Sequence, residues 1–259
     1  KIIPLENLDY VEVFENNTSD DLNLEKRIYP GFRNPYLDLI AQRGESVDAI
    51  LDHKLSSTKI AISKNNPLNF SAEEQFTIKG DTTDLAINLG VASENKTFLS
   101  SQGFGTLQHK DHTTTFYSDV SVSKDVGVNT KLVFNTSIGQ TNLEFENEGF
   151  VSASPIITNA INIGMFNYDE ERQIKTAVVL DAPLKVVDGQ LNLNTVSGYT
   201  AAGDYRKKTQ SIDLDDGSRD LNLSFYFDKE IDDNKNFGFK ATVSDSGAIS
   251  GAAFFGIKF

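Results

Sequence analysis

Cysteine is absent from this 259-residue sequence, so neither a disulfide framework nor a thiolate metal site can form. No apolar run approaches the roughly 20 residues that a membrane helix needs. Such a chain can span a bilayer only as a closed barrel of strands. Tryptophan is absent as well. Because Trp and Tyr usually line both rims of a membrane barrel, the 8 tyrosines would have to serve alone.

Basic residues are few, with 24 Lys and Arg against 37 Asp and Glu and a formal net charge of −13. This excess of negative charge disfavours binding to nucleic acid or to an anionic lipid surface. A soluble acidic protein or an extracellular surface fits the composition better. The length suits one large all-β domain or two smaller ones.

From Asp84 onward, apolar residues recur at every second position. Leu85, Ile87 and Leu89, for example, alternate with smaller or polar residues. A period of two predicts strands rather than helices. The same pattern returns in the runs 132–138, 161–165, 174–180, 191–193, 221–227 and 237–243.

Short polar connectors separate these runs, at residues 124–127, 169–172, 188–189 and 232–235. Connectors this short join antiparallel neighbours, so the sequence predicts a meander of hairpins. Asp188-Gly189 is the sharpest turn signal, because Asp-Gly supplies the positive φ angles of a tight hairpin.

The second face of the predicted strands is polar or small. In a soluble barrel or sandwich this face would point to water, whereas in a membrane barrel it would line the lumen and the apolar face would meet lipid. Alternation alone does not distinguish the two. The face consists of Asn88, Gly90, Asn135, Ser137, Asn162, Gly164, Asn192, Asn194, Asn222 and Ser224.

The first third of the chain is less regular. Residues 10–14 and 22–24 have strand character, while residues 46–55 carry apolar residues at helical spacing after a potential cap at Ser46. We place a boundary near residues 56–57. It divides the chain into an N-terminal linker and strand segment with a short helix, residues 1–57, and an antiparallel β-barrel, residues 58–259.

Two polar segments resemble metal sites. His109 and His112 flank a carboxylate, but the strand formers that follow them favour a hairpin tip. Residues 213–220 resemble a calcium loop, yet the twelfth position is Ser224 rather than Glu, so we favour a solvated acidic turn. No hydrolase signature or phosphate loop occurs, and we expect no catalytic residue, cofactor or metal.

The last residues form a two-faced strand. Phe255, Ile257 and Phe259 share one face, and Phe254, Gly256 and Lys258 share the other. A strand of this kind, ending on an aromatic residue, closes bacterial outer-membrane barrels.

The order of segments resembles the β-domain of subtilase-type autotransporters, which are secreted bacterial serine proteases followed by an outer-membrane barrel. Residues 178–189 are similar to that family's strand ending in Gln-Pro-Leu-Arg-Val before a Gly turn. Residues 213–221 are similar to its Asp-Leu-x-x-x-Gly-Arg-Glu-Leu connector. Residues 88–94 with residues 98–105 resemble a strand with its Gly-rich loop, and residues 11–17 resemble the segment that joins protease to barrel.

The resemblance implies an all-β fold, an antiparallel meander barrel of about 10 to 12 strands. It implies a translocator or anchor domain of a secreted subtilisin-like protein, at the outer membrane or cell surface. Such a domain is not itself an enzyme, because any protease activity would reside in a separate N-terminal domain. Its partners would be outer-membrane lipid, that passenger, and the barrel-assembly machinery, which would read Phe255, Ile257 and Phe259. The alternative is a soluble, secreted or periplasmic β-barrel or sandwich, an accessory or interaction domain of a secreted hydrolase.

Overall fold

The computed structural model describes residues 10–16, 35–36, 46–52, 56–63, 69–99, 101–102, 107–110, 112–215, 217–232 and 235–257. Across these residues there is no helix that is both long and apolar enough to cross a membrane.

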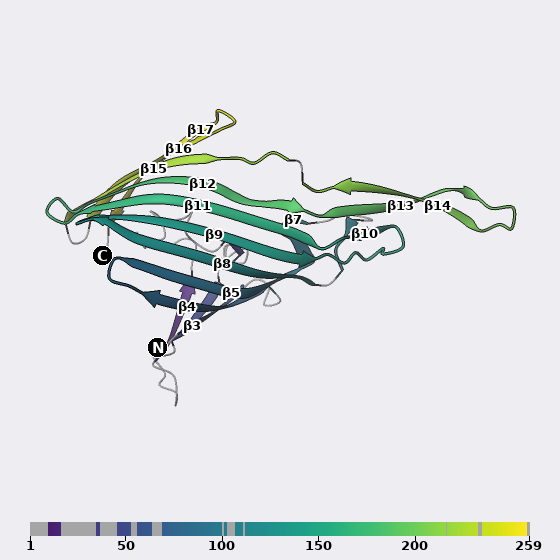
Figure 1. Ribbon diagram of the computed structural model, residues 1–259, viewed down its shortest axis with the longest axis horizontal. Coiled ribbons are helices and arrows are strands. Elements are labelled where there is room, and N and C mark those ends of the chain that lie inside the picture. Colours follow the sequence, from purple (N-terminus) through teal and green to yellow (C-terminus); the bar gives the residue numbers. More distant parts are fainter. Residues whose placement is uncertain are drawn as a thin grey trace.

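Within these residues, twelve strands form one antiparallel sheet in which each strand pairs with the next barrel strand along the chain (Figure 1). The fold is therefore an antiparallel meander β-barrel of the outer-membrane type, with a strand number in the expected range. The described pairings run from β1 to β17 and do not include one between these two end strands. The barrel strands are β1 (Tyr10–Asn16), β2 (Ser46–Asp52), β3 (Ser56–Ser63), β4 (Phe70–Lys79), β5 (Thr83–Asn95), β8 (His112–Gly127), β9 (Thr130–Asn142), β11 (Ile156–Asp169), β12 (Ile174–Asp188), β15 (Asn222–Asp232), β16 (Lys235–Ser244) and β17 (Ile249–Ile257).

The connections differ at the two ends of the barrel. Residues 80–82, 128–129 and 170–173 make short turns at the end that is on the left in Figure 1. At the opposite end several connections are long, as in residues 96–111, 143–155 and 189–221, while residues 245–248 make a short turn. Bacterial outer-membrane barrels have the same asymmetry, with short periplasmic turns and longer extracellular loops.

Parts of two connections, residues 143–155 and 189–221, form a second, three-stranded sheet. It contains β10 (Val151–Ala153), β13 (Gln190–Tyr199) and β14 (Tyr205–Asp213). The β13–β14 hairpin projects beyond the barrel at the long-connection end (Figure 1). The short strands β6 (Thr97–Phe98) and β7 (Ser101–Gln102) pair with each other in another connection.

The barrel wall is apolar on the outside and largely polar on the inside, where Phe166, Ala177, Val179 and Tyr226 form one apolar cluster. On β9, Asn135 is 2% exposed and Ser137 is also buried, while their strand neighbours Phe134 and Ile138 are exposed, Ile138 to 54%. Because alternate side chains of a strand point to opposite faces, the same alternation of buried and exposed residues is seen on β8 and β11. Other exposed members of the apolar face are Ile62, Phe70, Phe76, Leu89, Phe116, Leu132, Ile163, Met165, Val178, Leu180, Leu223, Phe225, Phe237, Val243 and Phe255.

The helix expected over residues 46–55 is a strand instead. β2 pairs along its whole length with β1 on one side and with β3 on the other. This pairing supplies partners for the backbone on both sides and overrides a weak local preference for helix. The strand expected over residues 10–14 is confirmed as β1, and the one expected over residues 22–24 lies outside the described residues.

The tight hairpin expected at Asp188-Gly189 is also wrong. β12 pairs with β11 and β15, whereas β13, which follows directly after Gly189, pairs with β10 and β14. Gly189 has φ of +146°, and a Cβ there would lie 3.1 Å from Cγ1 of Ile156. The glycine therefore provides a bend where the chain passes from the barrel wall into the projecting sheet.

Candidate functional site in the barrel interior

A buried carboxylate occupies the middle of the inner wall. Asp119 on β8 is 2% exposed, and its oxygens accept hydrogen bonds from Asn88 Nδ2 on β5 at 2.9 Å and from Asn135 Nδ2 and Ser137 Oγ on β9, both at 2.7 Å. All of these donors are neutral. Together these four residues form the Asp119 cluster, which ties three adjacent strands together through side chains as well as backbone.

A tyrosine from the segment between β1 and β2 lies against the same wall. Tyr36 is fully buried, and its hydroxyl is 2.7 Å from Oγ1 of Thr158 on β11. Its ring stacks on Tyr117 of β8, with centroids 4.7 Å apart and planes 11° from parallel. Burial raises the pKa of Tyr36 to about 12, so the phenol stays neutral at ordinary pH.

Two glycines make room for these rings. Gly90 on β5 and Gly139 on β9 are the direct cross-strand partners of Tyr117. A Cβ at Gly90 would be 2.4 Å from Cζ of Tyr117, and one at Gly139 would be 2.4 Å from Oη of Tyr36. Each ring therefore lies directly on backbone, an arrangement in which an aromatic side chain covers a glycine in a strand.

Beside the apolar cluster of Phe166, Ala177, Val179 and Tyr226, parts of the inner wall are polar and internally bonded. Thr115 and Thr141 share a hydrogen bond of 2.6 Å across β8 and β9. Lys59 pairs with the buried Glu73 at 3.6 Å across β3 and β4. Lys175 on β12 pairs with Glu230 on the neighbouring β15 at 3.1 Å. Cross-strand polar pairs therefore link neighbouring strands at several places in the interior.

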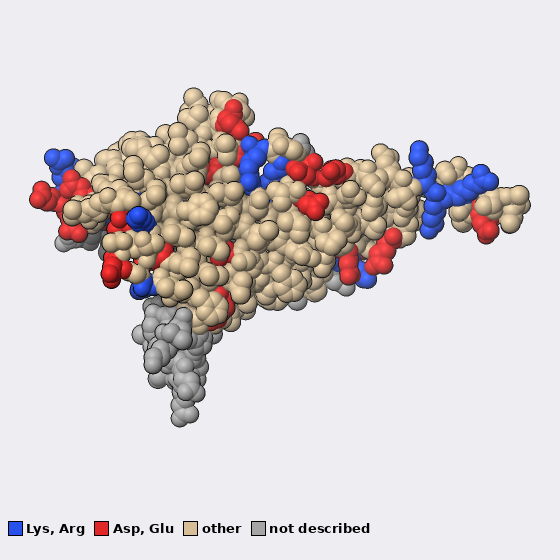
Figure 2. Space-filling model, viewed as in Figure 1, with Lys and Arg blue, Asp and Glu red and all other residues tan. Residues whose placement is uncertain are grey.

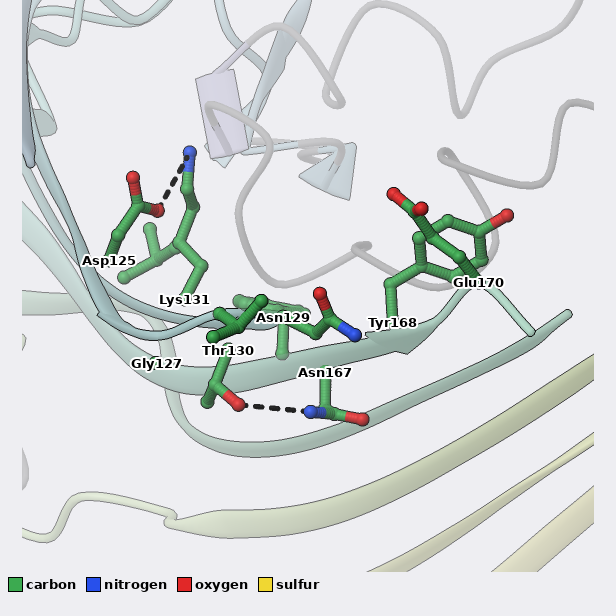
Figure 3. Close-up of a pocket in the computed structure, with 11 residues that line it drawn as sticks. Asp125, Gly127, Asn129, Thr130, Lys131, Asn167, Tyr168 and Glu170 are labelled. Carbon is green, nitrogen blue, oxygen red and sulfur yellow. Dashed lines mark hydrogen bonds and ion pairs between the residues drawn. The ribbon is translucent and has the colours of Figure 1, made fainter. Parts of the chain in front are cut away.

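An open cavity of about 560 Å³ lies at the short-turn end of the wall. Figure 3 shows Asp125 and Lys131 pointing toward each other from β8 and β9, and their charged atoms are 3.7 Å apart. Tyr168 and Glu170 extend from the end of β11 on the same side. The cavity combines both signs of charge, so its lining favours no single ionic ligand.

The sequence-predicted site residues do not meet in one place. Phe255 lies on the outward face of β17 and is 56% exposed. Ile257 is the last residue of β17, and Phe259 lies outside the described residues. Phe255 does not contribute to the interior site, and the role of the three residues as an assembly signal stays a prediction.

The two metal-like segments adopt other roles. The ring of His109 lies 5.4 Å from the ring of Phe145, and burial lowers the pKa of His109. His112 is the first residue of β8, and its side chain is exposed. In the acidic turn, Asp213 accepts a hydrogen bond from the Asp215 amide, and Asp215 pairs with Lys185 at 3.1 Å. Among the described residues, no three acidic, His or Cys side chains are grouped to hold a metal.

Sequence reasoning missed the centre of the site. Asn88, Gly90, Asn135 and Ser137 were recognised as one polar face, but Asp119 and Tyr117 on the strand between them were not. The available signal was a carboxylate and an aromatic residue, two positions apart, on the polar face of the run 113–123.

Comparison with known proteins found no matching family model and no matching curated protein. Among solved structures, the chain is similar to in-vitro folded OmpT, an outer membrane protein of Vibrio cholerae, with 11% identity and a TM-score of 0.50. The match covers 95% of this chain and 76% of that one. A loop L8 deletion mutant of OmpT matches at 12% identity over 97% and 74% of the two chains, with a TM-score of 0.49. At this identity the likeness establishes the fold alone.

This likeness corrects the interpretation that the chain is not itself an enzyme. That interpretation depended on the autotransporter resemblance, which assigns any protease activity to a separate domain. The structural likeness found is to an outer membrane protein, OmpT. Because a fold does not determine a function, the exclusion of catalysis is withdrawn.

Proposed function

We propose that this protein is an outer-membrane β-barrel that anchors its long-connection end at the cell surface and displays the β13–β14 hairpin there. The observation that carries the proposal is the inverted polarity of the barrel wall, apolar outside and largely polar inside. A soluble barrel or sandwich would turn the same two faces the other way. The exposed apolar face is also far more extensive than the scattered apolar residues of a soluble surface.

The strand lengths support a membrane position. β8 has 16 residues, β11 has 14 and β12 has 15. A tilted membrane strand needs roughly 9 to 11 residues. These strands therefore cross a bilayer with residues to spare at both ends, and the backbone within the bilayer is satisfied by pairing with neighbouring strands.

Of the two roles that the autotransporter resemblance implies, the interior favours anchoring over export. The inner wall buries Tyr36, Thr158 and Asp119 almost completely. Tyr36 hydrogen-bonds to Thr158 and stacks on Tyr117, and Asp119 is bonded within its own cluster. An exported chain would have to displace Tyr36 from Tyr117 and Thr158. A barrel whose interior is filled by these side chains serves as a rigid base for the β13–β14 hairpin at its outer end.

The proposal is tested by locating the two ends of the barrel in intact cells. A peptide tag inserted in the turn between Tyr199 and Tyr205 is expected to bind antibody on whole cells. The matched control is the same tag between Glu170 and Glu171 in a short turn, which is expected to bind only after permeabilisation. The folded barrel is expected in the outer-membrane fraction and to change its electrophoretic mobility on heating.

Two results would contradict the proposal. One is a protein that remains soluble at high concentration without detergent, which would restore the soluble accessory domain. The other is a hairpin tag that is shielded in intact cells while the short-turn tag is exposed, which would reverse the orientation.

The identity of a passenger is a separate proposal that rests on the resemblance alone. A subtilisin-like domain N-terminal to the barrel would be held at the surface by the same anchor. The coding sequence upstream of Lys1 decides this: a signal peptide followed by a subtilisin-like domain supports it, and any other arrangement removes it.

A further inference from the structure

The projecting hairpin carries a concentration of positive charge on an acidic protein. Arg206, Lys207 and Lys208 are consecutive on β14, and all three are exposed. None of the three forms an ion pair within the described part of the chain. Figure 2 shows Lys and Arg gathered over this hairpin at the far end of the molecule. The chain as a whole has a formal charge of −13, so the patch is local.

Two tyrosines stand beside these cations. Tyr199 and Tyr205 face each other across the end of the hairpin, with ring centroids 5.2 Å apart and planes at 42°. They are 66% and 63% exposed, so most of each ring is open to solvent. We call Tyr199, Tyr205, Arg206, Lys207 and Lys208 the hairpin tip.

The surroundings limit where an anion can bind. Another connection at the same end of the barrel carries Glu144, Glu146 and Glu148, and Lys110 is paired with two of them. Asp204 in the hairpin turn offsets only one of the three cations of the tip, so the tip retains an excess of positive charge. An anionic polymer is therefore repelled by the acidic connection and attracted to the projecting tip.

We propose that the hairpin tip binds an acidic polysaccharide outside the membrane. The guanidinium and ammonium groups bind the carboxylate or sulfate groups of the polymer, and the open tyrosine rings pack against the apolar faces of its sugar rings. The inference rests on the proposed function only for the outward position of the hairpin. Nucleic acid is the less suitable polymer, because double-stranded DNA carries one charge per about 1.7 Å and would meet the acidic remainder of the protein.

The test measures binding of alginate, a polyuronate, to the purified protein folded in detergent. The variant Arg206→Glu, Lys207→Glu, Lys208→Glu is expected to weaken binding at least tenfold, because it replaces three cations near the anionic polymer with three anions. The matched control is Lys79→Glu, Lys124→Glu, Lys229→Glu, which changes three exposed lysines elsewhere on the chain by the same charge. This control is expected to bind alginate as the parent does.

A second variant, Tyr199→Ala with Tyr205→Ala, keeps the charge and is expected to weaken alginate binding severalfold. Heat-dependent mobility verifies that every variant is folded. Equal loss in the two charge variants overturns the inference, as does binding of double-stranded DNA as tight as that of alginate at the same salt concentration. These failures are distinct from failure of the proposed function, because the tag experiment reports the location of the hairpin whether or not alginate binds.

Discussion

Tyr36 lies face to face with Tyr117, although the two residues come from different parts of the chain and only Tyr117 belongs to a barrel strand. The pair fits because Gly90 and Gly139 flank Tyr117 on the neighbouring strands. A contact of this kind fixes the segment between β1 and β2 to the inner wall at one defined point. It makes the interior testable by single substitutions.

Gly139→Ala is expected to destabilise the barrel by about 1–3 kcal/mol, the usual cost of overpacking. The added Cβ would lie 2.4 Å from the Tyr36 hydroxyl oxygen, so the ring has to leave Thr158 or the strand has to shift. The measurement is the urea midpoint of unfolding in detergent micelles. Gly149→Ala is the control, because a Cβ there meets no atom within 4 Å, and equal midpoints for the two variants would refute the docking of Tyr36.

The same contact predicts a dependence on alkaline pH. Burial raises the pKa of Tyr36 from 10.0 to about 12, so between these values the folded protein retains a proton that the unfolded chain has lost. The stabilisation is therefore complete below pH 10 and is lost as the pH rises toward 12, by up to about 1.4 kcal/mol per unit.

Urea midpoints at pH 8, 10 and 11 measure this loss. Tyr36→Phe has no proton to retain, so its midpoint is expected to fall less steeply than that of the parent. Comparing the two proteins removes the contribution of lysines and the other tyrosines. Parallel pH profiles would show that Tyr36 titrates normally.

Much of the barrel could be predicted from sequence because a strand has a period of two. The alternation from Asp84 onward located β5, β9, β11, β12, β15 and β16, and the short connectors predicted their antiparallel order. Which face points inward could not be predicted, because the pattern is the same in a soluble barrel and a membrane barrel. The two kinds of barrel are distinguished by burial: on β9 the polar Asn135 and Ser137 are buried, whereas the apolar Phe134 and Ile138 are exposed.

The errors have specific causes. Residues 46–55 fit helical spacing, but Val47, Ala49 and Leu51 also alternate, and pairing with two strands decides between the patterns. Asp188-Gly189 is a strong turn signal, yet here the chain bends without reversing. The contact of Tyr36 with Thr158 spans 122 positions, and no local pattern reports a contact at that separation.

Asp119→Asn is expected to destabilise the barrel by about 1–3 kcal/mol, the cost of leaving buried donors without acceptors. The carboxylate accepts from Asn88, Asn135 and Ser137, whereas a carboxamide has one acceptor oxygen and would direct its own NH₂ group at one of these donors. Asp81→Asn, in the exposed turn between β4 and β5, is the control for the change in charge. An Asp119→Asn midpoint within error of this control would mean that the cluster does not hold the three strands together.

The assembly signal predicted at Phe255, Ile257 and Phe259 is tested at its last residue. Phe259→Ser is expected to reduce the amount of heat-modifiable barrel in the outer-membrane fraction severalfold, because it removes the terminal aromatic residue from the face that carries Phe255. Lys258→Ser is the control, since alternation places residue 258 on the opposite face. Unfolding in detergent separates the explanations: a signal for the assembly machinery predicts normal stability of Phe259→Ser once it is folded in vitro, whereas a packing role predicts a lower urea midpoint. Normal assembly of Phe259→Ser in cells would remove the signal.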